Sequence, residues 1–402
     1  MMPPLSVYLH IPFCERKCIY CDFYSIENLA LREDFVDLLL AEIDLKLRSN
    51  PALEGRALQT IFFGGGTPSL LTPQELERII GKLQQYFSIA ADCEFTLECN
   101  PGTVSLDKLK AYRSLGVNRL SFGVQSFDAR ELEFLGRIHD AKQAKEAIAL
   151  ARQAGFDNVS LDLIFALPDQ EESVLRRTLD EAIKLETDHI SAYNLIVERG
   201  TPLYRLVQLG KVIELDADRA AALFDIVQDR LSEAGFAQYE ISNYAKSSEK
   251  RAKHNLVYWD GHKDYVSFGP SAHEFIDGVR AWNISSLEEY SKMIRAGKLP
   301  IINSERLTPE DRRTEILYLQ LRSTGIRLKD FESDFSEDLL KNQDVQWFME
   351  DGMLVSEEGL LKLTQKGYRF CDGIVTRLLR EREHTPTEIV LPLLQRQYGA
   401  AA

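Results

Sequence analysis

The chain has 402 residues, 45% of them apolar, and a formal net charge of −14 at pH 7. This length allows two or three domains of about 150 residues each, and the acidic balance without a strongly basic block speaks against broad nucleic-acid binding. No apolar run reaches the ~18 residues of a membrane span, and the first residues lack a signal-peptide pattern, so we expect a cytoplasmic protein.

Short apolar segments alternate with amphipathic helical patterns over the first 200 residues. Such alternation implies parallel strands with crossover helices. We predict an α/β fold that opens with a partial (β/α)6 barrel, because the alternation stops near Arg199. The alternative is an open doubly wound sheet, although no Gly-x-Gly-x-x-Gly follows the first strand. The expected strands cover residues 7–11, 60–63, 94–98, 119–124, 159–166 and 189–197, and the main helices cover 29–47, 72–87, 105–116, 140–155 and 172–185.

The pattern changes twice after the barrel, so we divide the chain into residues 1–200, 201–303 and 304–402. The second part is expected to be an α+β extension, with a helix over 216–234 and a turn-rich, loop-like stretch over 268–273. The third part shows the order helix, helix, hairpin, helix, which is typical of a winged-helix-like module. Because the chain is acidic, we infer no DNA binding from this module.

Three cysteines, Cys14, Cys18 and Cys21, follow the first strand with the spacing C-x3-C-x2-C. No further Cys or His lies close enough to complete a local zinc site. A 4Fe–4S cluster is usually held by four thiolates, so three thiolates leave one iron open to a small molecule. The neighbouring Arg16 and Lys17 are expected to favour thiolate over thiol. The other three cysteines have no cluster spacing and are expected to be buried side chains.

Polar residues follow the next strands at the predicted functional face. The glycine run at residues 64–66 allows a ligand to approach the backbone closely. Glu98 ends the third strand with a carboxylate that can accept hydrogen bonds, and Gln125 ends the fourth with an amide. Arg137 can pair bidentately with a carboxylate, and Asp162, inside the fifth strand, needs a partner or a ligand. Each alone has a structural explanation, but together they converge on one face.

This combination of motifs resembles the HemW branch of the oxygen-independent coproporphyrinogen oxidase (HemN-like) group of radical S-adenosylmethionine (SAM) proteins. The resemblance covers nearly the whole chain. The motifs that carry it are residues 8–14, 18–23, 64–69, 98–101, 123–127 and 254–259.

The resemblance implies a role for each matching position. Cys14, Cys18 and Cys21 would bind a 4Fe–4S cluster, and SAM would chelate the open iron. The SAM on the cluster would contact Tyr8, Gly65 and Glu98. A second SAM site, present in the oxidase relatives, would be lined by Tyr20, Gly66, Thr67, Gln125, Arg137 and Asp162.

Proteins of the HemW type are understood as haem chaperones, so the resemblance implies haem binding and its transfer to acceptors such as respiratory haem proteins. An acceptor in a membrane is compatible with this function, although the chain has no predicted transmembrane segment. The alternative is an enzyme of porphyrin biosynthesis, an oxygen-independent coproporphyrinogen III dehydrogenase. The oxidase carries another Cys where this chain has Phe23 and has a longer N-terminal extension, which disfavours that activity. The resemblance leaves open whether the protein is an enzyme.

A haem ligand is predicted at His254, in the motif His-Asn-x-x-Tyr-Trp, because an imidazole is a common axial ligand of haem iron. Tyr258 and Trp259 would pack on the porphyrin. The alternative is a structural histidine in a loop. His10 and His139 are interpreted as structural, since each flanks a motif without a clear role.

Overall fold

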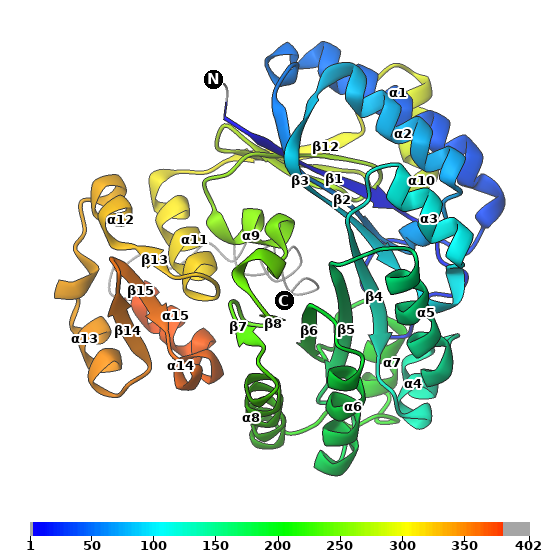
Figure 1. The fold of residues 1–402 in the computed structure, drawn as a ribbon. Helices are drawn as coiled ribbons and strands as arrows, with labels where there is room; N and C mark the ends of the chain where they lie inside the picture. Colours follow the sequence, from blue (N-terminus) through cyan, green and yellow to red (C-terminus); the bar gives the residue numbers. More distant parts are fainter. Residues whose placement is uncertain (1–2, 381–402) are drawn as a thin grey trace.

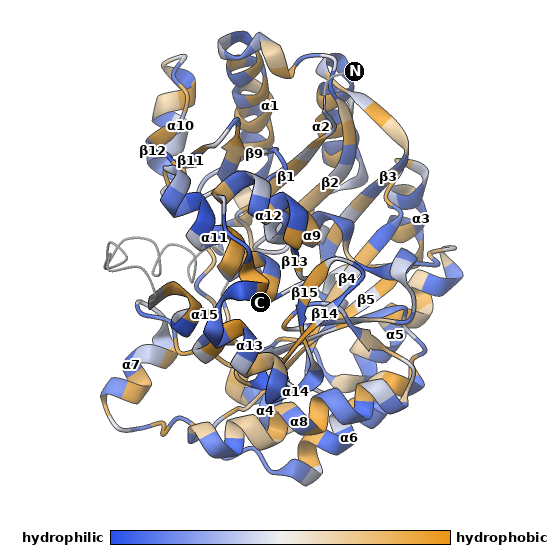
Figure 2. Cartoon of the chain, turned by 90° about the vertical axis from the view of Figure 1, so that its left-hand side faces the viewer, coloured by the Kyte–Doolittle hydropathy of each residue, from blue (hydrophilic) through white to orange (hydrophobic). Residues whose placement is uncertain are grey.

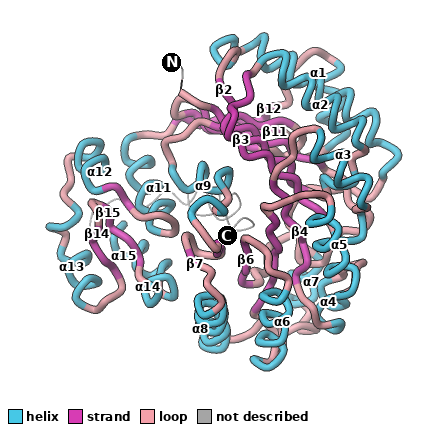
Figure 3. Tube along the Cα trace, in the orientation of Figure 1, coloured by secondary structure: helices cyan, strands magenta, loops and turns pink. Residues whose placement is uncertain are grey.

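The computed structural model describes residues 3–380. Its main feature is a curved sheet whose strands follow the order β12-β11-β10-β9-β1-β2-β3-β4-β5-β6-β8-β7 (Figures 1 and 3). Six neighbouring strands, β1 to β6, are parallel and lie in chain order. They are β1 Leu5–Ile11, β2 Ala57–Gly65, β3 Ser88–Cys99, β4 Arg119–Gln125, β5 Val159–Phe165 and β6 His189–Asn194. A doubly wound sheet reverses its strand order at a switch point, so the sequential order confirms the partial (β/α)6 barrel.

The helices between these strands cover the outer face of the sheet (Figure 1). Their starts follow the sequence signals: Thr72 forms a capping box with Glu75, and Ser105 and Asp140 cap the next two predicted helices. The helices are α1 Arg32–Ser49, α2 Pro73–Tyr86, α3 Leu106–Ser114, α4 Ala129–Leu135, α5 Ala141–Gln153 and α6 Glu172–Lys184. Hydrophilic and hydrophobic residues alternate along these helices (Figure 2). Among residues 3–380, no helix is long and apolar enough to cross a membrane.

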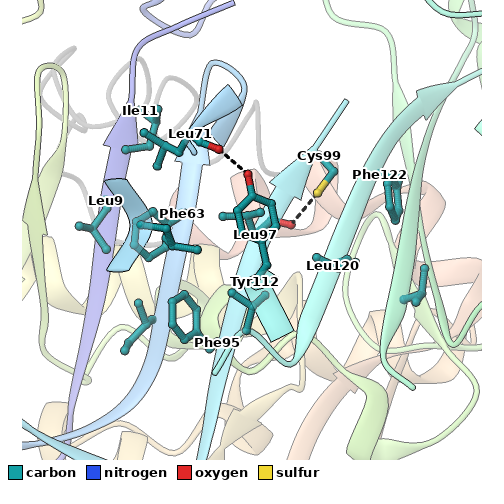
Figure 4. Packing of buried hydrophobic residues seen from close by; sticks show 14 of the residues in the cluster. Leu9, Ile11, Phe63, Leu71, Phe95, Leu97, Cys99, Tyr112, Leu120 and Phe122 are labelled. Atoms are coloured by element: carbon teal, nitrogen blue, oxygen red, sulfur yellow. Dashed lines mark hydrogen bonds between the residues drawn. The ribbon is translucent and has the colours of Figure 1, made fainter. Parts of the chain in front are cut away.

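Alternation along the strands separates an apolar outer face from a polar inner face. In β1, Leu9 and Ile11 are fully buried against the helices, and Phe63 and Leu97 join them from β2 and β3 (Figure 4). The residues between them in the chain point into the barrel, which places the predicted site residues Tyr8 and Glu98 on the inner face. Tyr112 closes the outer layer from α3, with its hydroxyl donating to the Leu71 carbonyl at 2.5 Å (Figure 4).

The predicted extension continues the same sheet instead of forming a separate layer. At the β1 edge of the six parallel strands, β9 pairs in parallel with β1 and leads into an antiparallel meander of β10, β11 and β12. At the β6 edge, β8 pairs antiparallel with β6. Phe268 and Tyr290 of this part belong to the same hydrophobic cluster as the barrel residues. The elements are α7 Pro202–Gln208, α8 Ala217–Glu233, β7 Ala237–Gln238, β8 Asn243–Ala245, α9 Lys253–Asp260, β9 Tyr265–Phe268, β10 His273–Ile276, β11 Val279–Asn283, α10 Leu287–Arg295 and β12 Ile301–Arg306.

The C-terminal module has its own three-stranded sheet and its own core. The predicted order of elements recurs, with an added α12 and with the last helix broken at Phe370; residues 381–402 of this predicted part lie outside the described residues. The elements are α11 Pro309–Leu321, β13 Ile326–Arg327, α12 Leu328–Phe335, α13 Gln343–Glu350, β14 Leu354–Glu357, β15 Leu360–Leu363, α14 Gln365–Arg369 and α15 Cys371–Arg380.

Candidate functional site

The three cysteines lie on a loop that leaves the carboxyl end of β1. Backbone hydrogen bonds close this loop at its neck, which is formed by residues 12–14 and Ile26. The Cys14 N–H donates to the Ile26 carbonyl at 3.0 Å, and the Ile26 N–H donates to the Pro12 carbonyl at 2.8 Å. Within the loop the Cys21 N–H donates to the Cys18 carbonyl at 3.3 Å. All six cysteines of the chain are free thiols. The neck therefore fixes the first cysteine, and the turn brings the other two together.

Two predicted SAM-site residues contact sulfur atoms of this loop. The Thr67 hydroxyl lies 3.5 Å from Cys14 Sγ, and Arg137 Nη1 donates to Cys18 Sγ at 3.2 Å. Burial, followed by the charge of Cys18, raises the pKa of Cys21 to about 12; the charge of Lys17 lowers this pKa, as expected, but does not outweigh burial. Metal ligation, which requires the thiolate, must therefore displace this proton.

The cysteine loop fits a cubane cluster better than a single ion. Among residues 3–380, no group of three or more His, Cys, Asp or Glu side chains is arranged to hold one metal ion. In a 4Fe–4S cluster each thiolate binds a different iron, so the three sulfur atoms need not converge on a point. The thiol-rich loop supplies the soft donors that such a cluster takes.

The glycine run at residues 64–66, which ends β2, is packed against the base of the loop and against the inner face. A Cβ on Gly66 would lie 2.6 Å from the Phe13 carbonyl oxygen, and one on Gly65, whose φ is +105°, would lie 2.7 Å from the His10 ring. The Gly65 N–H donates to Glu98 Oε2 at 3.1 Å. Only glycine allows β2 and β1 to approach so closely here.

Two carboxyl groups lie on the inner face of the barrel, Glu98 on β3 and Asp162 on β5, with β4 between these strands. Burial, with the nearby charge of Asp162, raises the pKa of Glu98 to about 8, and burial likewise raises the pKa of Asp162. Ser121 Oγ donates to Asp162 Oδ1 at 3.1 Å, and Ser191 forms a second hydrogen bond with this carboxyl group. Burial and the charge of Glu98 raise the pKa of Tyr8 well above its usual value. The site thus offers carboxyl and hydroxyl groups to the amine and hydroxyl groups of a ligand.

Gln125 and Arg137 meet at the end of β4. Gln125 is a non-glycine residue with φ +70°, and its buried Oε1 has no hydrogen-bond partner among the described residues. Arg137 Nη2 donates to the Gly123 carbonyl at 2.7 Å, and Arg137 also bonds the hydroxyl of Tyr20. The unpartnered Oε1 of Gln125, on a strained backbone beside the partly buried Arg137, is ready to accept a hydrogen bond from a ligand.

His254 lies at the start of α9 and not in a loop. Its Nδ1 is 2.7 Å from Thr60 Oγ1 and its Nε2 is 2.8 Å from the Tyr258 hydroxyl, and the ring is fully buried against Phe62. Burial lowers its pKa to about 3. Trp259 is buried in the core of the C-terminal module. Haem ligation by His254 stays a prediction, and this geometry speaks against it because neither ring nitrogen is free.

The structure adds residues that the sequence reasoning missed. Ser121 and Ser191 flank Asp162, and Arg119 is buried on the inner face, 2% exposed, with its Nε unpartnered among the described residues. These residues occupy alternate positions of the parallel strands. That alternation is the signal that could have found them once the strand register was known.

Comparisons with known proteins agree with this geometry. The family model of the radical SAM superfamily matches residues 8–182, and that of the HemN C-terminal domain matches residues 307–370. The chain is similar to proteins described as heme chaperone HemW. The relative from Bacillus subtilis is 36% identical over 90% of this chain and 96% of its own length, and that from Mycobacterium tuberculosis is 35% identical over 94% and 95%.

Among solved structures, coproporphyrinogen III oxidase (HemN) from Escherichia coli superposes with a TM-score of 0.79 at 24% identity. The match covers 93% of this chain and 89% of that one. This likeness shows a shared fold. Together with the near-full-length similarity to the HemW proteins, it leads to one assignment. The chain belongs to the radical SAM superfamily and, within it, to the HemW family.

Proposed function

We propose that this protein is a haem chaperone that binds haem and passes it to acceptor haem proteins, such as respiratory ones, in the cytoplasm. The observation that carries the proposal is the similarity, over at least nine-tenths of this chain, to relatives described as heme chaperones. The described residues contain no membrane-spanning helix, so an acceptor held in a membrane would be met at its surface.

The cysteine loop supports the cofactor part of the proposal. Cys14, Cys18 and Cys21 would hold a 4Fe–4S cluster, which supplies an electron to SAM bound at its open iron. Tyr8, Gly65 and Glu98 would bind that SAM: Glu98, kept protonated by burial, and the tyrosine hydroxyl present hydrogen-bonding groups, and the glycine lets the backbone approach. The remaining predicted residues would line a second SAM, namely Tyr20, Gly66, Thr67, Gln125, Arg137 and Asp162.

Within this site the roles of the chain's own residues follow from their contacts. Arg137 would fix the position of Cys18 and balance thiolate charge through its hydrogen bond to Sγ. Gln125 would accept a ligand hydrogen bond at its unpartnered Oε1. For His254 we propose that its two hydrogen bonds order α9 under the barrel; binding haem iron there would require one of them to break.

The proposal is tested on the anaerobically reconstituted protein. We expect about four iron atoms per chain, an EPR signal of the reduced cluster that changes when SAM is added, and a Soret band when haem is titrated. Haem-loaded protein should then load an apo-haem protein such as apomyoglobin.

The cysteine assignment has a matched control. Replacing Cys14, Cys18 and Cys21 together with Ala should abolish iron binding, whereas Cys93→Ala and Cys371→Ala, at buried thiols outside the loop, should retain it. Full iron content in the triple variant would exclude the cluster assignment. A wild-type protein that binds no haem would exclude the chaperone function.

A further inference from the structure

Arg119 is a buried arginine that forms no ion pair among the described residues. Its side chain belongs to β4 and is 2% exposed, and its Nε has no hydrogen-bond partner there. The other buried arginines of residues 3–380 each pair with a carboxylate; they are Arg56, Arg280, Arg313 and Arg322. A guanidinium keeps its positive charge inside a protein, and an unpaired buried charge is costly. The exception therefore points to a role for the charge itself.

The strand register places Arg119 close to two predicted SAM contacts on the inner face. The next residue, Leu120, packs into the outer core, so the side chain of Arg119 points into the barrel. Arg119 pairs with Thr96 on β3, two residues before Glu98. Asp162 lies on β5, on the other side of β4. The guanidinium therefore comes from the strand between the two carboxyl groups and starts nearer the amino ends of the strands.

The charge of Arg119 acts on both carboxyl groups without binding either. Burial, followed by the charge of Asp162, raises the pKa of Glu98 to about 8, and the Gly65 N–H and the charge of Arg119 oppose this rise. Burial likewise raises the pKa of Asp162, and a hydrogen bond with Ser191 and the charge of Arg119 oppose it. One cation is thus shared by two carboxyl groups.

The other titratable and charged groups that face these carboxyl groups do not supply this shared charge. Tyr8 on β1 and Tyr193 on β6 face them, and burial raises the pKa of each hydroxyl well above its usual value, so both are neutral. Arg137 lowers the pKa of Asp162 but does not act on that of Glu98. Arg119 is therefore the cation that compensates a negative charge on Glu98.

We propose that Arg119 is a positioning residue of the predicted SAM site, whose unpaired charge allows Glu98 and Asp162 to become negative together when SAM binds. This inference rests on the proposed SAM binding. The positive sulfonium of SAM favours the ionised form of a nearby carboxyl group, but two carboxylates on one face repel each other. A cation on the strand between them offsets this repulsion. A direct ion pair would instead hold one carboxylate away from the ligand.

The test is the pH dependence of SAM binding by the anaerobic, cluster-loaded protein, measured by calorimetry. Arg119→Gln and Arg119→Met, which are both neutral, should raise the pKa of Glu98 by about one unit. Because SAM binds the ionised form in this scheme, the Kd should rise about tenfold at pH 7 and less than about twofold at pH 9.5. Arg119→Lys keeps the charge and should restore most of the affinity at pH 7.

Two further variants separate the charge from the packing of the inner face. Thr96→Val is the matched control, since Thr96 pairs with Arg119 and its Oγ1 has no partner among the described residues. It should keep the wild-type Kd at every pH. In a Glu98→Gln background, Arg119→Gln should lose the pH-dependent part of its effect. The proposal is overturned if the neutral variants raise the Kd by one factor at pH 7 and 9.5, or if they bind SAM as wild type does.

A measurement without SAM separates this inference from the proposed function. In the SAM-free protein the free energy of unfolding should fall as pH rises to the folded-state pKa of Glu98, about 8. Arg119→Gln raises that pKa, so in urea denaturation the fall should continue to about pH 9. If wild type binds no SAM, the cofactor part of the proposed function fails. A fall that ends at the same pH in Arg119→Gln and wild type would overturn the role of Arg119.

Discussion

The contact of Gly66 with the neck of the cysteine loop leads to a prediction for Gly66→Ala. The added Cβ would lie 2.6 Å from the Phe13 carbonyl oxygen and 2.9 Å from both the Ile11 carbonyl oxygen and the Phe13 nitrogen. All three atoms belong to backbone, and the Gly66 N–H already donates to the Ile11 carbonyl at 2.9 Å. No flexible side chain can yield, so β1 and the neck must shift.

Overpacking of this kind costs about 1–3 kcal/mol. The lower entropy of the unfolded alanine chain offsets about 0.4–1 kcal/mol of it. We therefore expect a net loss of about 1–2 kcal/mol in the free energy of unfolding, measured by urea denaturation of the cluster-free protein. The displaced neck should also lower the iron content after reconstitution, because Cys14 follows Phe13 directly.

Gly102→Ala is the matched control, because a Cβ there would meet no atom within 4 Å. It should leave the iron content unchanged and should not lower stability. If Gly66→Ala unfolds at the wild-type urea midpoint and binds the wild-type amount of iron, the steric reasoning about the neck is wrong.

Two further predictions concern the barrel and its chemistry. Burial raises the pKa of Glu98 from 4.5 to about 8 in the folded state, so between these pH values the folded state binds more protons than the unfolded state. The free energy of unfolding of the SAM-free protein should therefore fall as pH rises from 4.5 to 8. Glu98→Gln should flatten this dependence in urea denaturation at pH 5, 6.5 and 8; an unchanged slope would show that Glu98 is not the titrating group. Second, coproporphyrinogen III should not be decarboxylated in an anaerobic assay with SAM and reductant, because Phe23, 40% exposed on the cysteine loop, stands where the resemblance to the oxidase predicts a cysteine. Chromatographic detection of protoporphyrinogen formed at an enzyme-dependent rate would favour the oxidase alternative.

The barrel could be predicted from sequence because its signals are local. Each strand is followed by an amphipathic helix, and Thr72, Ser105 and Asp140 mark helix starts by side-chain caps that the structure reproduces. The strand order then follows from the handedness and adjacency of crossover connections. The cysteine loop was found for the same reason, since its three thiols lie within eight residues.

The meander could not be predicted because its stability comes from distant partners. β9 has four residues, and its neighbour β1 lies about 260 residues earlier in the chain. The predicted turn over 268–273 is the connection between β9 and β10, but the sequence pattern did not reveal the two strands that it joins. The hydrogen bonds of His254 could not be predicted for a related reason: Thr60, which lies 2.7 Å from its Nδ1, is 194 residues away, and no local pattern reveals that bond.

The short helix α9 has a mechanical consequence for the whole molecule. Its eight residues place His254 inside the barrel and Trp259 inside the core of the C-terminal module. A helix of this length has little stability of its own, so its stability comes from its packing against both cores. Separating the C-terminal module from the barrel would require removing His254 or Trp259 from its buried position, so α9 holds the two parts together. The predicted SAM contact Tyr8, whose ring lies 6.3 Å from that of His254, is therefore the neighbour of a helix that both cores share.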